Sequence, residues 1–277
     1  MPTQMWNILS EMPAIGLDEM SGIRLLRRID TKFVTTVDKL AAFLTAAAPY
    51  YYVQELNGSR LADYHTLYFD TPDCRMYSKH QLGHANREKL RIRSYMDSGI
   101  SFLEVKRKDN HGCTHKSRMA LEGFAADDPI AEQFFLDDAD VRRCCHPFLS
   151  AHLSYDVSAL RSQLSNRFQR VTMVNHAKTE RLTIDTDLHF RHTRSGAASV
   201  LPHVAVLEVK RAGHSPSPAL KLLRELRIFP HGMSKYCIGM ALLSDEVRVN
   251  RMKPKLHSVL KMTQSMDRQT DDDNAKG

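Results

Sequence analysis

The stretch REKLRIRSYMDSGISFLEVKRKDNHGCTHKSR, residues 87–118, decides the fold. Along it, charged residues occupy every second position, and apolar residues occupy most of the positions between them. Successive side chains of a strand point to opposite faces, so an extended chain would place these charges on one face. The charged positions are Arg91, Arg93, Glu104, Lys106, Lys116 and Arg118. The pattern predicts strands with a charged face.

The same pattern recurs elsewhere in the chain. Leu207-Glu208-Val209-Lys210 repeats Leu103-Glu104-Val105-Lys106 about a hundred residues later. Charged and apolar residues also alternate from Arg181 to Leu188 and from Arg28 to Phe33. A single strand of this kind is usually a solvated surface strand. At least five segments with one design indicate that their charged faces meet.

The recurrence of this pattern from Arg28 to Lys235 favours one domain for a chain of 277 residues. We expect residues 1–21 to form an N-terminal extension, residues 22–249 the domain, and residues 250–277 a disordered tail, because the end is polar and charged. Helices are expected at Val37–Ala48, between Ala126 and Leu164, at Ala219–Leu226 and before Ser244. Further strands are expected at Tyr50–Leu56 and Leu61–Asp70, joined by an Asn57-Gly58 hairpin turn, and at Phe168–His176 and Glu180–Leu188.

The charged faces have a common explanation in a closed antiparallel β-barrel. If helices cover the outside of a barrel, the apolar faces pack against them and the charged faces line the lumen. Clustered like charges need anions, and Arg and Lys together suit a chain of phosphates. The expected phosphate-binding residues are Arg28, Lys32, Arg91, Arg93, Lys106, Lys116, Arg118, Arg181, Lys210 and Lys235. The sequence therefore predicts an α+β fold, an eight-stranded antiparallel barrel with flanking helices.

The carboxylates among these cations suggest a metal. Glu208, with Glu104 or Asp185 as further candidates, would hold Mg²⁺ or Mn²⁺, since such ions combine one or two carboxylates with substrate phosphates. Glu104 is equally well explained as a salt-bridge partner of a neighbouring Arg or Lys. Asp185 has the alternative role of orienting Arg181.

Composition limits the other possibilities. The net charge of +7 and the pI near 9.2 point to a polyanionic partner. Nucleic acid is disfavoured, because no nucleic-acid-binding motif is present and aromatic residues interleave poorly with the basic ones. The five scattered cysteines lack CxxC spacing, and there is neither a signal peptide nor a membrane-spanning apolar run. We expect a soluble, cytoplasmic protein with free thiols.

Eight motifs in order resemble the VTC domain, the polyphosphate polymerase domain of the vacuolar transporter chaperone complex. The VTC domain belongs to the triphosphate tunnel metalloenzyme (CYTH-like) superfamily. The resemblance covers Gly22 to Leu243. The motifs are RIDTKF (28–33), LYFDTPD (67–73), REKLRIRSY (87–95), FLEVKRK (102–108), KSR (116–118), RLTIDTDL (181–188), LEVK (207–210) and SKYCIGM (234–240).

The resemblance implies a metal-dependent phosphotransferase. It would move the terminal phosphoryl group of ATP, or of another nucleoside triphosphate, onto a phosphate or polyphosphate chain. It implies that Arg91, Arg93, Lys106, Arg181 and Lys235 act in catalysis and that Glu208 is the principal metal ligand.

The sequence departs from the superfamily pattern at its first motif. The ExExK signature of hydrolytic members is replaced by Arg28-Ile29-Asp30-Thr31-Lys32, which leaves fewer metal ligands. The sequence shows no SPX domain or membrane helices and does not identify a membrane-bound partner. Two alternatives remain beside the polymerase: a triphosphatase acting on tripolyphosphate or a nucleoside triphosphate, and a polyphosphate-binding module without turnover.

Overall fold

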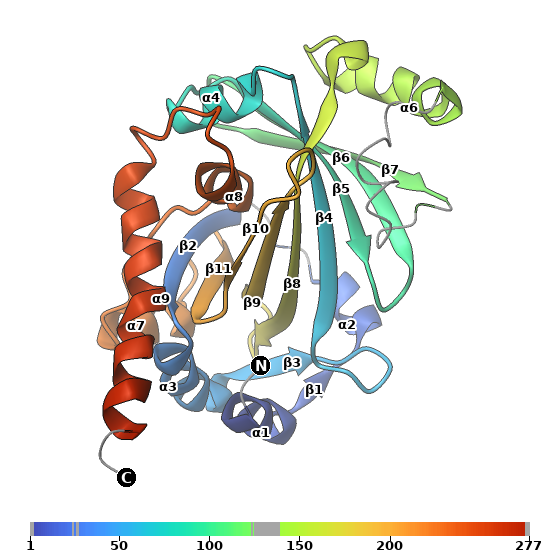
Figure 1. Cartoon of the computed structure of the whole chain (residues 1–277). Coiled ribbons are helices and arrows are strands. Elements are labelled where there is room, and N and C mark those ends of the chain that lie inside the picture. Colours follow the sequence, from blue (N-terminus) through green and yellow to red (C-terminus); the bar gives the residue numbers. More distant parts are fainter. Residues whose placement is uncertain (1–2, 24, 26–27, 123, 125–138, 275–277) are drawn as a thin grey trace.

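Eight antiparallel strands form the central sheet of the computed structural model, which describes residues 3–23, 25, 28–122, 124 and 139–274 (Figure 1). Their order across the sheet is β2-β11-β9-β8-β4-β5-β6-β7, with the short strands β1, β3 and β10 added at the side. The strands are β1 (Ala14–Ile15), β2 (Arg28–Thr36), β3 (Tyr51–Gln54), β4 (Ala62–Asp70), β5 (Arg87–Tyr95), β6 (Ile100–Lys108), β7 (Thr114–Leu121), β8 (Arg161–Asn175), β9 (Glu180–His192), β10 (Ala198–Leu201) and β11 (Val204–Ala212).

The sheet is strongly curled. Glu208 on β11 affects the pKa of Lys106 on β6, although four strands lie between β11 and β6 in the sheet. The charged side chains therefore line a concave face, as the alternation predicts. The eight-stranded antiparallel fold with flanking helices is confirmed, but the closed barrel is not. Among the described residues β2 and β7 do not pair, and β7 alternates exposed with half-buried positions as an edge strand does.

One half of the convex face is covered by three helices, α1 (Thr3–Glu11), α3 (Val37–Ala47) and α7 (Pro218–Glu225). They pack on the apolar faces of β2, β8, β9 and β11 in one buried cluster. Thr36 caps α3, and Ser217 caps α7 with Pro218 in its first turn, which is why these helices begin where the sequence predicts.

The other half of the convex face, over β4, β5 and β6, is covered by α6 (Ala139–His152). This helix lies within the region predicted to be helical, of which residues 125–138 lie outside the described residues. The helical prediction is wrong near Leu164. A short 3-10 turn at Val157–Ala159 leads directly into β8, a strand of 15 residues.

The two segments flanking Asn57-Gly58 do not form the expected hairpin. Both glycine and asparagine have positive φ, so the turn is correct, and a bridge links Leu56 to Ser59. However, β3 and β4 each pair with β8, one after the other, because β8 is long enough to take both.

One helix packs against the concave side at one end of the sheet. Helix α8 (Lys235–Leu243) lies so close to β8 and β9 that a Cβ on Gly239 would come within 2.4 Å of a methyl carbon of Leu164. Helices α2 (Leu17–Ser21) and α4 (Arg75–Gln81) lie at opposite ends of the sheet (Figure 1). Apolar side chains thus fill the concave face at the α8 end, and the rest of the concave face is polar.

The C-terminal stretch is helical, contrary to the disorder expected after Asn250. Helix α9 (Lys253–Asn274) runs along the β2 and β11 side of the sheet (Figure 1). Met252 and Val259, which are seven residues apart, are buried in the same cluster as α8. Residues seven apart lie on the same face of a helix, and the burial of these two side chains anchors the start of α9. In the described part of the chain, no helix is long and apolar enough to cross a membrane.

Candidate functional site

The strand register places the charged residues of the concave face directly opposite one another on neighbouring strands. Across the sheet, the directly opposed pairs are Lys32 and Glu208, Lys210 and Arg181, Asp185 and Arg170, Arg91 and Glu104, Glu104 and Arg118, and Lys106 and Lys116. Directly opposed residues share a face and lie close together. Residues from seven strands thus form one charged surface.

Glu208 is held by two lysines. Its carboxylate lies 2.8 Å from Nζ of Lys32 and is also paired with Lys210. Burial would raise the pKa of Glu208, but Lys32 and Lys210 outweigh burial and keep the pKa well below its usual value. Glu208 is therefore ionised and already compensated by protein cations.

Asp185 is also compensated by two cations. Arg170 donates two hydrogen bonds to it, from Nε to Oδ1 at 2.5 Å and from Nη2 to Oδ2 at 2.8 Å, and Lys235 forms a further ion pair with it. Lys235 comes from the first turn of α8, where Ser234 caps the helix. Burial lowers the pKa of Lys235 to about 7, although Asp185 opposes this shift.

Glu104 forms the third such group. It is fully buried and pairs with Arg91, whose Nη2 lies 2.6 Å from its Oε2, and with Lys116. Burial would raise its pKa, but Arg91 and the neighbouring cations lower it to about 2. The salt-bridge role expected for Glu104 is the arrangement present in the structure.

Three further cations lack such compensation. Among the described residues, neither Lys106 nor Arg93 forms an ion pair, and the buried Nε of Arg93 has no hydrogen-bond partner. Arg91, burial and Arg93 together lower the pKa of Lys106 to about 6. Lys89 donates to Oγ of Ser234 at 2.8 Å, and burial lowers its pKa to about 8. The centre of the concave face thus holds basic side chains without carboxylate partners, and a bound anion would favour their charged forms.

The remaining predicted residues lie at the edges of this surface. Arg28 pairs with Asp30 at the exposed end of β2. Arg181 donates to the backbone oxygen of Met20 at 3.0 Å. Arg118 is exposed and its guanidinium lies 4.7 Å from the ring centroid of Phe102.

The sequence prediction missed Arg170 and Lys89. Lys89 continues the alternation of Arg91 and Arg93 by one step, so the pattern contained the signal. Arg170 has no charged neighbours at alternate positions, and only its place opposite Asp185 reveals its role.

Comparison with known proteins agrees with this geometry. The family model of the VTC domain matches residues 27–244. The chain belongs to the VTC domain family. The predicted family is therefore confirmed, over nearly the extent expected from the motifs.

Two solved structures are similar to this VTC domain at low sequence identity. A putative adenylate cyclase from Bacillus halodurans is 15% identical, with a TM-score of 0.46 and coverage of 76% of this chain and 94% of that one. A putative adenylyl cyclase from Hippeastrum, described as having a dominant triphosphatase activity, is also 15% identical, with a TM-score of 0.46 and coverage of 78% and 96%. No curated protein matches the chain.

The three carboxylates of the concave face differ in how accessible they are to a metal ion. In the described part of the chain, no three His, Cys, Asp or Glu residues gather as a metal site. Glu208 is the most accessible of the three carboxylates, with 19% of its side chain exposed against 6% for Asp185 and 0% for Glu104. Mg²⁺ and Mn²⁺ are commonly held by one carboxylate together with substrate phosphates. Glu208 is therefore the carboxylate that best fits a metal held jointly by one protein carboxylate and the substrate phosphates.

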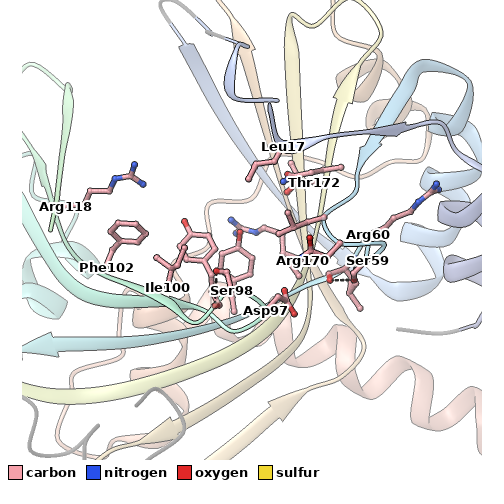
Figure 2. A pocket seen from close by; sticks show the side chains of 17 residues that line it. Leu17, Ser59, Arg60, Asp97, Ser98, Ile100, Phe102, Arg118, Arg170 and Thr172 are labelled. Carbon is pink, nitrogen blue, oxygen red and sulfur yellow. Dashed lines mark hydrogen bonds between the residues drawn. The ribbon is translucent and has the colours of Figure 1, made fainter. Parts of the chain in front are cut away.

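A pocket opens at the end of the concave face away from α8 (Figure 2). It has a volume of about 340 Å³ and lies between β8, the β5–β6 turn, β7 and α2. Arg170 and Arg118 reach it from the charged surface, while Leu17 and Ile100 stand at its rim. The pocket is thus continuous with the cationic surface.

Proposed function

We propose that this VTC domain binds the phosphates of ATP, or of another nucleoside triphosphate, on its concave face. It transfers the terminal phosphoryl group to a phosphate or polyphosphate chain. The observation that carries the proposal is that Lys106, Arg93 and Lys89, at the centre of the cationic surface, have no carboxylate partner among the described residues. A polyanion of several charges, such as a chain of phosphates, complements such a surface.

The residues of the surface then have distinct roles. Arg91, Arg93 and Lys106 lie in the centre and contact the phosphate oxygens, while Arg181, Lys32 and Lys210 extend the contacts toward β2. The carboxylates of Glu104 and Asp185 hold Arg91 and Arg170 in fixed orientations. Donors fixed before the substrate arrives stabilise a transition state without reorganising.

Catalysis by this surface is largely electrostatic. Phosphoryl transfer needs neutralised equatorial oxygens and an in-line nucleophile rather than a strong base. A terminal phosphate is already anionic at neutral pH, so the acceptor needs no Ser, Cys or His to activate it. When bound, Mn²⁺ or Mg²⁺ neutralises phosphate charge, and Glu208 is the residue that would hold it.

All five cysteines are free, which supports the expected cytoplasmic location.

Product analysis tests this function directly. Purified protein is incubated with ATP and Mn²⁺, and the products are resolved by gel electrophoresis and phosphate assay. Long polyphosphate with ADP is the expected result, and Lys106→Met should abolish it. Lys39→Met, which removes an exposed lysine from α3 on the convex side, is the matched control and should retain activity.

The alternatives give different products in the same assay. Orthophosphate without polyphosphate would instead identify a triphosphatase. Tight binding of ATP or polyphosphate with no product would identify a binding module. Either result would overturn the polymerase proposal.

A further inference from the structure

Asp70, the last residue of β4, is a fully buried carboxylate that the proposed function does not use. Its Oδ1 accepts hydrogen bonds from the backbone N–H groups of Thr71 at 2.7 Å and Met76 at 2.8 Å. Its Oδ2 accepts from the backbone N–H of Tyr77 at 2.8 Å and from the hydroxyl of Tyr236 at 2.7 Å. Burial raises the pKa of Asp70, and these bonds oppose the shift. Since all four partners donate, the ionised carboxylate is the form that fits this site.

The bonds of Asp70 join the starts of two helices. Met76 and Tyr77 belong to the first turn of α4, whose N–H groups have no partner within the helix. Asp70 satisfies them in place of Cys74, the residue before the helix, whose side chain forms no cap bond. Tyr236 belongs to the first turn of α8, which lies at the same end of the sheet as α4 (Figure 1). One carboxylate thus ties α8 to α4.

Polar contacts of α8 are concentrated in its first turn. Beyond Lys235 and Tyr236 the helix continues as CIGMALL, which is almost entirely apolar. Tyr236 donates to Asp70, and Lys235 forms an ion pair with Asp185. Successive residues of an α-helix point about 100° apart. These two contacts therefore hold the first turn of α8 from two directions.

The position of this turn matters because Lys235 belongs to the cationic surface. Its Nζ lies 3.9 Å from the ring centroid of Phe168, on the concave face. A lysine side chain is long and flexible, so the place of its backbone decides which oxygen its amine can reach. Displacement of a binding group by about 1 Å can cost as much as a hundredfold in function. A contact that fixes the backbone at Lys235 therefore bears on phosphate binding.

We propose that Asp70 and Tyr236 are positioning residues of the phosphate site. Their hydrogen bond holds the first turn of α8 where the amine of Lys235 reaches the phosphate chain. This inference rests on the proposed function and adds to it two residues that touch no phosphate themselves. The alternative is a purely structural role, in which the bond stabilises the fold and has no influence on Lys235.

A double-mutant cycle distinguishes these two roles. The affinity for tripolyphosphate is measured by calorimetry for Tyr236→Phe, alone and combined with Lys235→Met. Phenylalanine keeps the ring, which stacks on Tyr68 at 5.2 Å and meets Tyr77 edge-on at 6.3 Å, and lacks only the hydroxyl. In Lys235→Met, Asp185 keeps its pair with Arg170, so we expect the fold to be retained.

The effect of the hydroxyl should depend on the lysine. With Lys235 present, Tyr236→Phe should weaken tripolyphosphate binding roughly 2- to 100-fold, the range of coupling between residues of one network. In the Lys235→Met background the same change should cost less than about twofold, because the hydroxyl then positions no charge.

The matched control is Tyr77→Phe. It removes another tyrosine hydroxyl of the same buried cluster, which donates to the backbone oxygen of Arg248 at 3.2 Å. The backbone N–H of Tyr77, and with it the bond to Asp70, is retained. Both single variants should unfold at lower urea concentration than wild type, since each loses a hydrogen bond. Only Tyr236→Phe should weaken tripolyphosphate binding.

The outcomes separate this inference from the proposed function. Wild-type protein that binds tripolyphosphate, with an affinity unchanged in Tyr236→Phe, would refute the positioning role alone. Equal weakening by Tyr236→Phe with and without Lys235 would refute it too, because the effect would not pass through the lysine. The same holds if Tyr77→Phe weakens binding as much as Tyr236→Phe, since lost stability would then be sufficient. Wild-type protein that does not bind tripolyphosphate would overturn both proposals.

Discussion

Lys106 should take up a proton when a polyphosphate binds. In the free protein, Arg91, burial and Arg93 lower its pKa from 10.5 to about 6. At pH 8 its amine is then only about 1% protonated, by the relation between pKa and pH. A bound triphosphate supplies the missing negative charge and raises the pKa of Lys106 toward its ordinary value.

The sign of the pH dependence follows from this shift. The protonated amine is the form that attracts phosphate, so affinity falls as pH rises above about 6 and continues to fall until the pKa of the complex is reached. One proton taken up corresponds to about a tenfold loss of affinity per pH unit. Lys235, with a pKa of about 7, should contribute a second proton above pH 7 in the same direction.

Calorimetry measures the proton directly. Tripolyphosphate is titrated into the protein at pH 8 in buffers of different ionisation enthalpy, and the slope of the observed enthalpy gives the protons taken up. Lys106→Met should lower this number by about one relative to wild type, because a fully shifted amine gains one proton. Lys39→Met should leave it unchanged. An equal slope in wild type and Lys106→Met would refute the reasoning, and ionisation of the ligand cancels in this comparison.

Three further substitutions have expected outcomes. Glu208→Gln should abolish Mn²⁺-dependent ATP turnover. It should preserve the affinity for tripolyphosphate measured by calorimetry without metal, because Lys32 and Lys210 are then free to bind phosphate. Full activity of this variant would exclude Glu208 as the residue that holds the metal. Arg91→Ala should weaken tripolyphosphate binding and lower the free energy of unfolding in urea by about 3 kcal/mol, because it breaks a buried ion pair of Glu104; an unchanged midpoint would contradict this. Gly239→Ala should cost about 1–3 kcal/mol in the same assay through overpacking, whereas Gly16→Ala, with no atom within 4 Å of its Cβ, should change stability little.

The alternation of charged and apolar residues was sufficient to predict the faces of β5, β6 and β11. It worked because strand parity is a local property: once Leu90 and Ile92 pack under α6, Arg91 and Arg93 must point to the other side. The sequence also contained the cap residues of α3 and α7. Local signals therefore predicted which residues share a surface.

Partnerships between strands could not be predicted in the same way. From the sequence, Asp185 was a candidate metal ligand, with the orientation of Arg181 as its alternative role, but in the structure it binds Arg170 and Lys235. Those contacts depend on the register of β8 against β9 and on the position of α8 inside the curl. Sequence spacing contains neither quantity. The same limit hid the open edge between β2 and β7.

A row of four aromatic rings on the concave face is the clearest case of this limit. Tyr64, Tyr95, Phe102 and Phe168 come one each from β4, β5, β6 and β8, so their adjacency cannot be read from any one strand. A bulge in β8 between Arg167 and Gln169 also changes the parity around Phe168, which removes even the local signal for its direction. Only the assembled sheet places the four rings side by side.

The pairing of charges divides the concave face into two functional classes. Glu104, Asp185 and Glu208 each bind two cations, so those cations are already compensated and their side chains are held in place. Lys106 and Arg93 are uncompensated, so the free energy available for binding an anion is concentrated on them. Loss of a paired cation should therefore reduce both stability and binding, whereas loss of an unpaired one should reduce binding and relieve repulsion in the free protein. Since the unpaired cations lie one and two steps along the strands from Tyr95 and Phe102, the strongest anion site adjoins the pocket that these rings line.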